Sequence, residues 1–112
     1  MTIETRFLSE ELKKYKVYKE RYEELSKIKE RDKFLVEGLE RYYIRIGYFL
    51  EAVDRALANL SCLHRSFFNG YYEKGKSIEK MAIEMALTQC TVERLKKEII
   101  NEVAKEMGFL QD

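Results

Sequence analysis

The residues best suited to chemistry with a nucleic acid lie in the stretch TQCTVERLKK, residues 88–97. Thr88 is an N-cap candidate, so a helix is predicted to begin directly after it. Val92, Leu95 and Ile99 fall on one side of that helix, which leaves polar side chains on the other side. The outward set contains an amide, a guanidinium and an ammonium group: Gln89, Cys90, Glu93, Arg94 and Lys97. This mixture suits a helix that enters the major groove of DNA.

Six residues of this stretch are the predicted DNA contacts. Gln89 and Arg94 can reach base edges, as readers of adenine and guanine respectively. The other four are predicted to touch phosphate, which positions a protein without reading sequence; they are Thr88, Thr91, Lys96 and Lys97. Cys90 could meet a thymine methyl group, although no special role is the simpler interpretation.

A shorter helix is predicted just before this stretch, over residues 78–85, with Ser77 as its cap. Its apolar residues recur at helical spacing and make one face: Ile78, Met81, Ala82 and Met85. Two short helices with small Ala82 at their crossing and Leu87 filling the turn follow the helix-turn-helix plan. An ordinary helical hairpin packed into a bundle would show the same spacing, so both interpretations stay open on spacing alone.

The composition predicts an all-α protein of about five helices. The chain has 112 residues with no proline and only five glycines, so few residues break a helix. Hydrophobic content of 46% is enough for a core, and charged content of 37% favours long solvated helices. The net charge of +1 argues mildly against non-specific nucleic-acid binding, although basic residues gather modestly around the predicted motif.

Three helical runs are predicted in the first half of the chain. The first begins after Ser9, or alternatively Thr5, and continues to about Arg31. The second is capped by Asp32 and covers residues 33–47, with Phe34 on its apolar face, and the third covers residues 48–60. Whether residues 33–60 form one helix or two is left open, because Gly38 and Gly47 could each mark a bend.

The second half is predicted to hold a further helix capped by Ser61 and ending at Gly75, before the helix-turn-helix. The last helix is expected to continue to Met107, with Gly108 as the residue that ends it. The sequence therefore predicts two units. Residues 1–48 would form a helical hairpin or coiled-coil arm that packs or dimerises, and residues 49–112 would form the domain with the helix-turn-helix motif.

Other chemistry is not expected. Cys62, His64 and Cys90 are too few and lack the paired spacing of a structural zinc site, so no metal is predicted. With one histidine, no glycine-rich phosphate loop and no catalytic constellation, neither an enzyme, a cofactor nor a small-molecule substrate is expected. The tyrosines at helical spacing are interpreted as helix packing or dimerisation rather than base stacking. Two cysteines without a signal peptide or membrane-spanning segment predict a reduced, cytoplasmic protein without membrane contact.

The segment from residue 56 to residue 108 carries a series of landmarks in a fixed order. They are Ala56-Leu57 and Leu60, Phe67-Phe68 and Tyr71-Tyr72, Gly75, Ser77, Met81-Ala82, Leu87, Thr88, and the run from Thr91 to Lys97. This segment resembles region 4 of bacterial sigma factors and, more closely, the small phage transcription regulators of the ArpU/RinA type. The turn of that family commonly has glycine where Ala86 stands, so a left-handed turn is expected to be less comfortable here.

The resemblance implies sequence-specific binding of double-stranded DNA and control of phage or prophage genes. The protein would act as a homodimer through its N-terminal helices, or alongside RNA polymerase. Two alternatives stay open: a helical protein-interaction module that docks on polymerase or a sigma factor without DNA, and a recognition subunit of phage DNA packaging.

Overall fold

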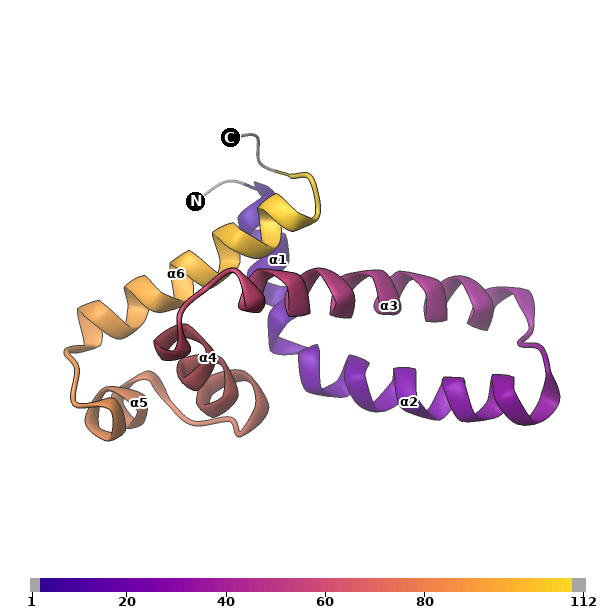
Figure 1. Ribbon diagram of the computed structural model, residues 1–112, viewed down its shortest axis with the longest axis horizontal. Helices are drawn as coiled ribbons and strands as arrows, with labels where there is room; N and C mark the ends of the chain where they lie inside the picture. The colour runs from indigo at the N-terminus through magenta and orange to yellow at the C-terminus, as the bar shows by residue number, and fades with distance from the viewer. Residues whose placement is uncertain (1–2, 110–112) are drawn as a thin grey trace.

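The computed structural model describes residues 3–109, and that part of the chain is all α-helical, as predicted (Figure 1). Residues 3–109 form six α-helices and one π-helical turn, where about five helices were expected. In chain order they are α1 (Ile3–Lys13), α2 (Tyr15–Asp32), α3 (Glu37–Ala58), α4 (Cys62–Phe68), the π-helical turn η1 (Asn69–Glu73), α5 (Ile78–Met85) and α6 (Gln89–Glu106).

The prediction of one helix from Ser9 to Arg31 is wrong, because the chain bends at Lys14. This residue leaves the helical conformation, at φ −96° and ψ 6°, and its N–H donates to the Glu11 carbonyl at 3.0 Å. Ser9 and Thr5 both lie inside α1, so the helix does not begin after either of them. The bend lets α1 pack against α6 while α2 packs against α3. Tertiary packing therefore overrides a continuous helical pattern at this point.

The predicted cap at Asp32 is also wrong, because Asp32 is the last residue of α2. Lys33 takes a left-handed conformation, at φ 69°, and its N–H donates to the Lys29 carbonyl at 2.8 Å. Phe34 consequently falls in the connection and is 68% exposed. The next helix, α3, then runs unbroken through Gly38 and Gly47, so the open question is settled as a single helix. It also crosses residues 48 and 49, and the division of the chain at that boundary stays a prediction.

The caps predicted in the second half are confirmed. Ser61 begins α4, and its Oγ accepts from the backbone N–H of His64 while the His64 ring reaches back to the Ser61 N–H. Gly108 ends the last helix in a left-handed conformation, at φ 79°. The helix after Ser61 does not run evenly to Gly75, since it widens into the π-helical turn η1. Gly70 lies in this turn and packs against Met81. A Cβ atom on residue 70 would lie too close to the Met81 sulfur, so glycine fits this position.

The core is organised around α6, which packs against α1, α3, α4 and α5. Its inward side chains are buried almost completely: Val92, Leu95, Ile99, Ile100, Val103 and Ala104. They meet Leu8 and Leu12 of α1, Val53 of α3 and Phe67 of α4 in one cluster. The hairpin of α2 and α3 extends from this cluster to one side (Figure 1).

Tyrosines hold the hairpin together, which confirms their predicted role in helix packing. The rings of Tyr22 and Tyr43 stack with centroids 4.5 Å apart, and the Tyr43 hydroxyl lies 3.0 Å from the Ser26 hydroxyl. Gly47 makes room for this stack, since a Cβ there would lie 2.7 Å from the Tyr22 ring. Tyr48 is the exception, because it faces solvent at 52% exposure.

We expect Gly47→Ala to lower the free energy of unfolding by about 1 kcal/mol, because overpacking against Tyr22 outweighs the helix propensity gained. Gly38→Ala is the matched control in the same helix, with no atom near its Cβ. It should instead raise stability by about 0.5 kcal/mol. Urea unfolding followed by circular dichroism measures both, and a stabilised Gly47→Ala variant would show that the ring stack is not rigid.

A second prediction concerns the Tyr72 hydroxyl, which is buried and, among the described residues, has no hydrogen-bond partner. Tyr72→Phe should therefore raise the free energy of unfolding by about 1 kcal/mol, because it removes an unsatisfied buried group. Tyr18→Phe is the contrasting control and should destabilise, since the Tyr18 hydroxyl donates to Glu11 at 2.8 Å.

The same hydroxyl should respond to alkaline pH. Burial raises the pKa of Tyr72 above its ordinary 10.0, so the folded state holds this hydroxyl neutral at a pH where the unfolded chain already ionises it. Stability is therefore unaffected by this ionisation below pH 10.0 and falls as the pH rises beyond it. Wild type should lose stability above pH 10 more steeply than Tyr72→Phe in thermal melts. If stability falls equally steeply with pH in wild type and Tyr72→Phe, the buried Tyr72 hydroxyl is not the cause of the alkaline loss.

Candidate nucleic-acid interface

Helices α5 and α6 begin at the two residues predicted to cap them. The Ser77 Oγ accepts from the backbone N–H of Lys80 at 3.1 Å, and the Thr88 Oγ1 accepts from that of Thr91 at 3.1 Å. The Thr88 and Thr91 hydroxyl oxygens also lie 2.9 Å apart. Both helices therefore start at fixed points on either side of a short connection.

The turn between these helices closes on Ala86, which takes the left-handed conformation at φ 56° and ψ 44°. The N–H groups of Ala86 and Leu87 donate to the carbonyls of Ile83 and Ala82, at 3.2 and 2.9 Å. This is the glycine-type helix ending known as the Schellman motif, made here with an alanine. A non-glycine residue in this conformation is strained, as expected from the sequence.

Packing between α5 and α6 covers the apolar face predicted for the helix after Ser77. Met81 and Ala82 of α5 are buried, and Val92 and Leu95 of α6 are buried beside them. Leu87, expected to fill the turn, packs partly buried against the same cluster. The two helices are therefore held against each other, with their polar sides facing out.

The predicted contact residues fall into two groups in the structure. Gln89, Arg94 and Lys97 are exposed, and their side chains have no hydrogen-bond or ion-pair partner among the described residues 5–109. The other three have partners within the chain. Thr88 and Thr91 make the helix cap, and the Lys96 ammonium lies 5.3 Å from the centroid of the Tyr71 ring in η1.

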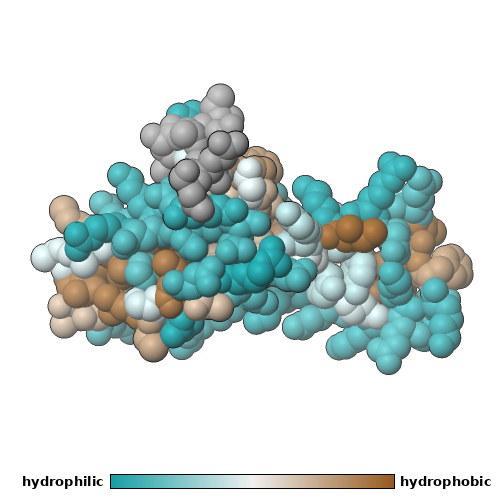
Figure 2. Space-filling view, turned by 45° about the horizontal axis from the view of Figure 1, so that its top comes forward, coloured by the Kyte–Doolittle hydropathy of each residue, from teal (hydrophilic) through white to brown (hydrophobic). Residues whose placement is uncertain are grey.

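Charges around α5 and the start of α6 are mixed. Lys74 and Lys80 are exposed, whereas Lys76 pairs with Glu84 of α5 at 3.0 Å. Apolar side chains share this surface: Ile83 of α5 is 80% exposed, and Figure 2 shows hydrophobic patches among hydrophilic ones in this part of the molecule, on the left. The surface is thus only locally basic.

One contact of α6, made by His64, was not predicted from the sequence. His64 of α4 lies with its Nε2 3.2 Å from the Glu98 carboxylate, while its Nδ1 lies 2.7 Å from the Ser61 hydroxyl. It thereby ties α4 to the solvent side of α6. His64 and Glu98 are 34 positions apart in the chain, so no local pattern could have paired them.

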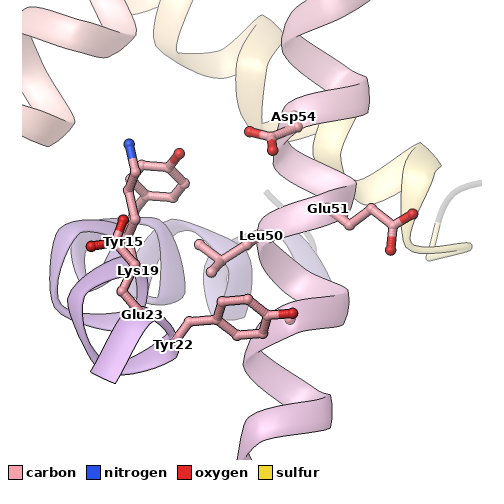
Figure 3. A pocket seen from close by; sticks show the side chains of 8 residues that line it. Tyr15, Lys19, Tyr22, Glu23, Leu50, Glu51 and Asp54 are labelled. Atoms are coloured by element: carbon pink, nitrogen blue, oxygen red, sulfur yellow. The ribbon is translucent and has the colours of Figure 1, made fainter. Parts of the chain in front are cut away.

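A cleft of about 520 Å³ lies where α2 crosses α3 (Figure 3). Its acidic side chains diverge, since Figure 3 shows Glu51 turned away from the side where Tyr15 and Asp54 lie. Burial, with the charges of Asp54 and Glu73, raises the pKa of Tyr15 to about 12, so this hydroxyl stays protonated at neutral pH. The cleft offers no paired carboxylates for acid-base chemistry.

Among the side chains described, residues 5–109, no three histidine, cysteine or acidic groups lie together in a way that could hold a metal ion. Cys62 and Cys90 are both free thiols at the surface, and Cys62 accepts from the Arg65 guanidinium at 3.2 Å. In the same part of the chain, none of the helices combines the length and the apolar character that crossing a bilayer demands.

Comparison with known proteins shows a similarity to a phage protein. Over 68 residues, 58% of this chain, the sequence is 32% identical to the transcriptional activator rinA of Staphylococcus phage phi11. The matched region covers 49% of that protein, so the chain spans about half the length of the curated relative it matches. No family model and no solved structure matches. The chain is therefore similar to a phage transcriptional activator, whereas the resemblance to sigma region 4 is not shown.

Ala86 supplies a test of the turn. We expect Ala86→Gly to raise the free energy of unfolding by about 1 kcal/mol, because glycine adopts the left-handed conformation without steric cost. Ala58→Gly is the control: Ala58 is exposed and right-handed helical, so its replacement should destabilise. Thermal unfolding of both variants measures the effect. If Ala86→Gly is destabilising as well, the turn does not have this conformation.

Proposed function

We propose that this protein is a phage or prophage transcription regulator that binds double-stranded DNA in a sequence-specific manner. Its reading unit would be a helix-turn-helix made by α5 and α6, with α6 in the major groove. The observation that carries the proposal is the outward face of α6, where Gln89, Arg94 and Lys97 are exposed and without partners inside the described chain. The similarity to a phage transcriptional activator supports a regulatory, non-enzymatic role.

The positions of these side chains suggest separate roles. Gln89 is the first residue of α6, and Arg94 lies farther along the same helix. Both can form bidentate hydrogen bonds, Gln89 with adenine and Arg94 with guanine. Lys97 is one turn beyond Glu93 and can meet a phosphate of the backbone. Lys96 would have to leave the Tyr71 ring to do the same.

The cap of α6 would stand at the backbone of the DNA. Thr88 and Thr91 hold the helix start through their hydroxyl groups, and backbone N–H groups at such a start favour a phosphate. The two threonines would therefore act chiefly by fixing the angle at which α6 enters the groove. Residues 1–48 would serve as the packing or dimerisation element, and RNA polymerase is a further partner of this proposal.

A second candidate is a protein-interaction module that uses the same helices without DNA. It is favoured by the net charge of +1 and by Ile83, which is 80% exposed on α5 beside α6. An exposed apolar residue next to the predicted reading face is more typical of contact with protein than with phosphate.

Fluorescence anisotropy of a labelled random-sequence duplex across a salt series tests the proposal. Wild type should bind at low salt with a log-log slope on the order of −3 to −6, as expected for a few phosphate contacts. Arg94→Ala/Lys97→Ala should lose most of that affinity. Lys27→Ala/Arg31→Ala is the matched control, since it removes the same two charges from exposed positions of α2 near the far end of the α2–α3 hairpin and should bind like wild type.

Selection of a preferred operator from a random DNA library separates the residues that read bases from those that contact phosphate. Gln89→Ala should relax the preference at one base pair at a cost of about 1–3 kcal/mol, whereas Lys97→Ala should weaken all sequences alike. In the anisotropy experiment, two results would reject DNA binding by α6 in favour of the interaction module. One is an equal loss of affinity in the control variant and in Arg94→Ala/Lys97→Ala, and the other is a wild type that does not bind at low salt.

A further inference from the structure

The outward side of α3 carries a stripe whose charge pattern is complementary to itself. The stripe consists of six exposed residues, separated alternately by four and three positions: Glu37, Arg41, Ile44, Tyr48, Glu51 and Arg55. This alternation is the spacing of a coiled-coil seam, so all six lie along one line of the helix. The buried residues of α3 lie on other sides of the helix, facing α2 and α6.

We propose that a second copy of this protein docks on this α3 stripe, with the two α3 helices antiparallel about a twofold axis. The axis would pass between Ile44 and Tyr48, so that each copy presents the same surface to the other. Running antiparallel in this register, the facing pairs are Glu37 with Arg55, Arg41 with Glu51, and Ile44 with Tyr48, each made twice.

The charges favour this orientation over the parallel one. Within one chain, Arg41 pairs with Glu37 at 2.6 Å, and Arg55 pairs with Glu51 at 3.2 Å and with Glu106 of α6 at 3.0 Å. In the antiparallel arrangement, the Glu37–Arg41 pair of one copy lies against the Glu51–Arg55 pair of the other. These four charges alternate in sign, and one such group lies at each end of the seam. Parallel docking in register would instead set each charge against its own copy, and like charges at an interface select against that arrangement.

The centre of the stripe supplies the apolar contact. Ile44 is 60% exposed and Tyr48 is 52% exposed, which leaves most of both side chains in water. A groove of about 420 Å³ opens beside them, lined also by Phe7 of α1 and Met107 after α6. Ile44 of the second copy would meet Tyr48 at the edge of this groove. Removing these surfaces from water drives the association, while the charges at both ends set its register.

The α3 stripe has an apolar centre, Ile44 and Tyr48, between charged residues at both ends. An apolar centre with a charged rim is the usual anatomy of a specific protein contact. This inference goes beyond the proposed function, because the seam does not depend on whether α6 binds DNA.

Single charge reversals test the seam by sedimentation velocity. The full chain should sediment as a dimer at tens of micromolar. Arg41→Glu and Glu51→Arg should each weaken the dimer by at least about tenfold, because each sets two pairs of like charges face to face. An equimolar mixture of these two variants should recover dimers as tight as wild type, since the reversed charges then face opposite ones. Native mass spectrometry identifies the mixed species.

Lys27→Glu is the matched control, because it reverses an exposed charge on α2 and should leave the dimer unchanged. Thermal melts of every variant confirm that each one folds. A monomeric wild type would overturn the proposal, as would single variants that dimerise as tightly as wild type. Larger assemblies that survive both reversals would also overturn it.

Cysteine cross-linking tests the orientation directly, in a chain that carries Cys62→Ser and Cys90→Ser. Ile44→Cys chains mixed with Tyr48→Cys chains should form the mixed disulfide at least about tenfold faster than either chain links to itself, because only facing positions bring two Cβ atoms within bonding range. Faster linkage of each chain to itself would indicate parallel helices and would overturn the antiparallel seam.

Discussion

The buried stripe of α6 is the interaction on which the rest of the structure depends. Its apolar side chains meet α1, α3, α4 and α5, so one helix belongs at once to the core and to the candidate reading surface. A stripe of this kind fixes the rotation of α6 about its own axis. Because Val92, Leu95 and Ile99 must point inward, Gln89, Arg94 and Lys97 must point outward. The exposed face is therefore a consequence of core packing.

The hairpin of α2 and α3 is held by a different kind of contact. Stacked tyrosines and the Lys29–Glu40 ion pair join its helices, and the glycine at position 47 allows the rings to approach. The main contacts of α3 are with α2 and α6, and the side that carries the α3 stripe is exposed. In the two proposals the α3 stripe and the α6 face have separate tasks, one for a second copy and one for DNA. A regulator built on both would present two reading helices in a fixed relation, which multiplies contacts.

Local signals in the second half of the chain were strong enough to predict structure residue by residue. Ser61, Ser77 and Thr88 each have a hydroxyl that accepts from a backbone N–H three residues on, and such caps act over one turn without help from the rest of the fold. In the first half, the prediction of one continuous helix was wrong because the bend depends on contacts with the rest of the fold. Residues 9–31 form a helical pattern without a breaker, and the bend at Lys14 follows from where α1 and α2 find partners. Of the six predicted contact residues, the exposure of three followed from periodicity, whereas the contact of Lys96 with Tyr71 joins two different elements.

The sequence by itself determined the all-α class, the caps of the last three α-helices and the outward face of α6, because these depend on helical period and on contacts within one turn. Only the tertiary structure decided that α1 and α2 separate, that α3 is one helix and that His64 reaches Glu98. It also decided which side of α3 stays free. These features depend on which helices meet, and contacts between residues far apart in the chain leave no mark in local spacing.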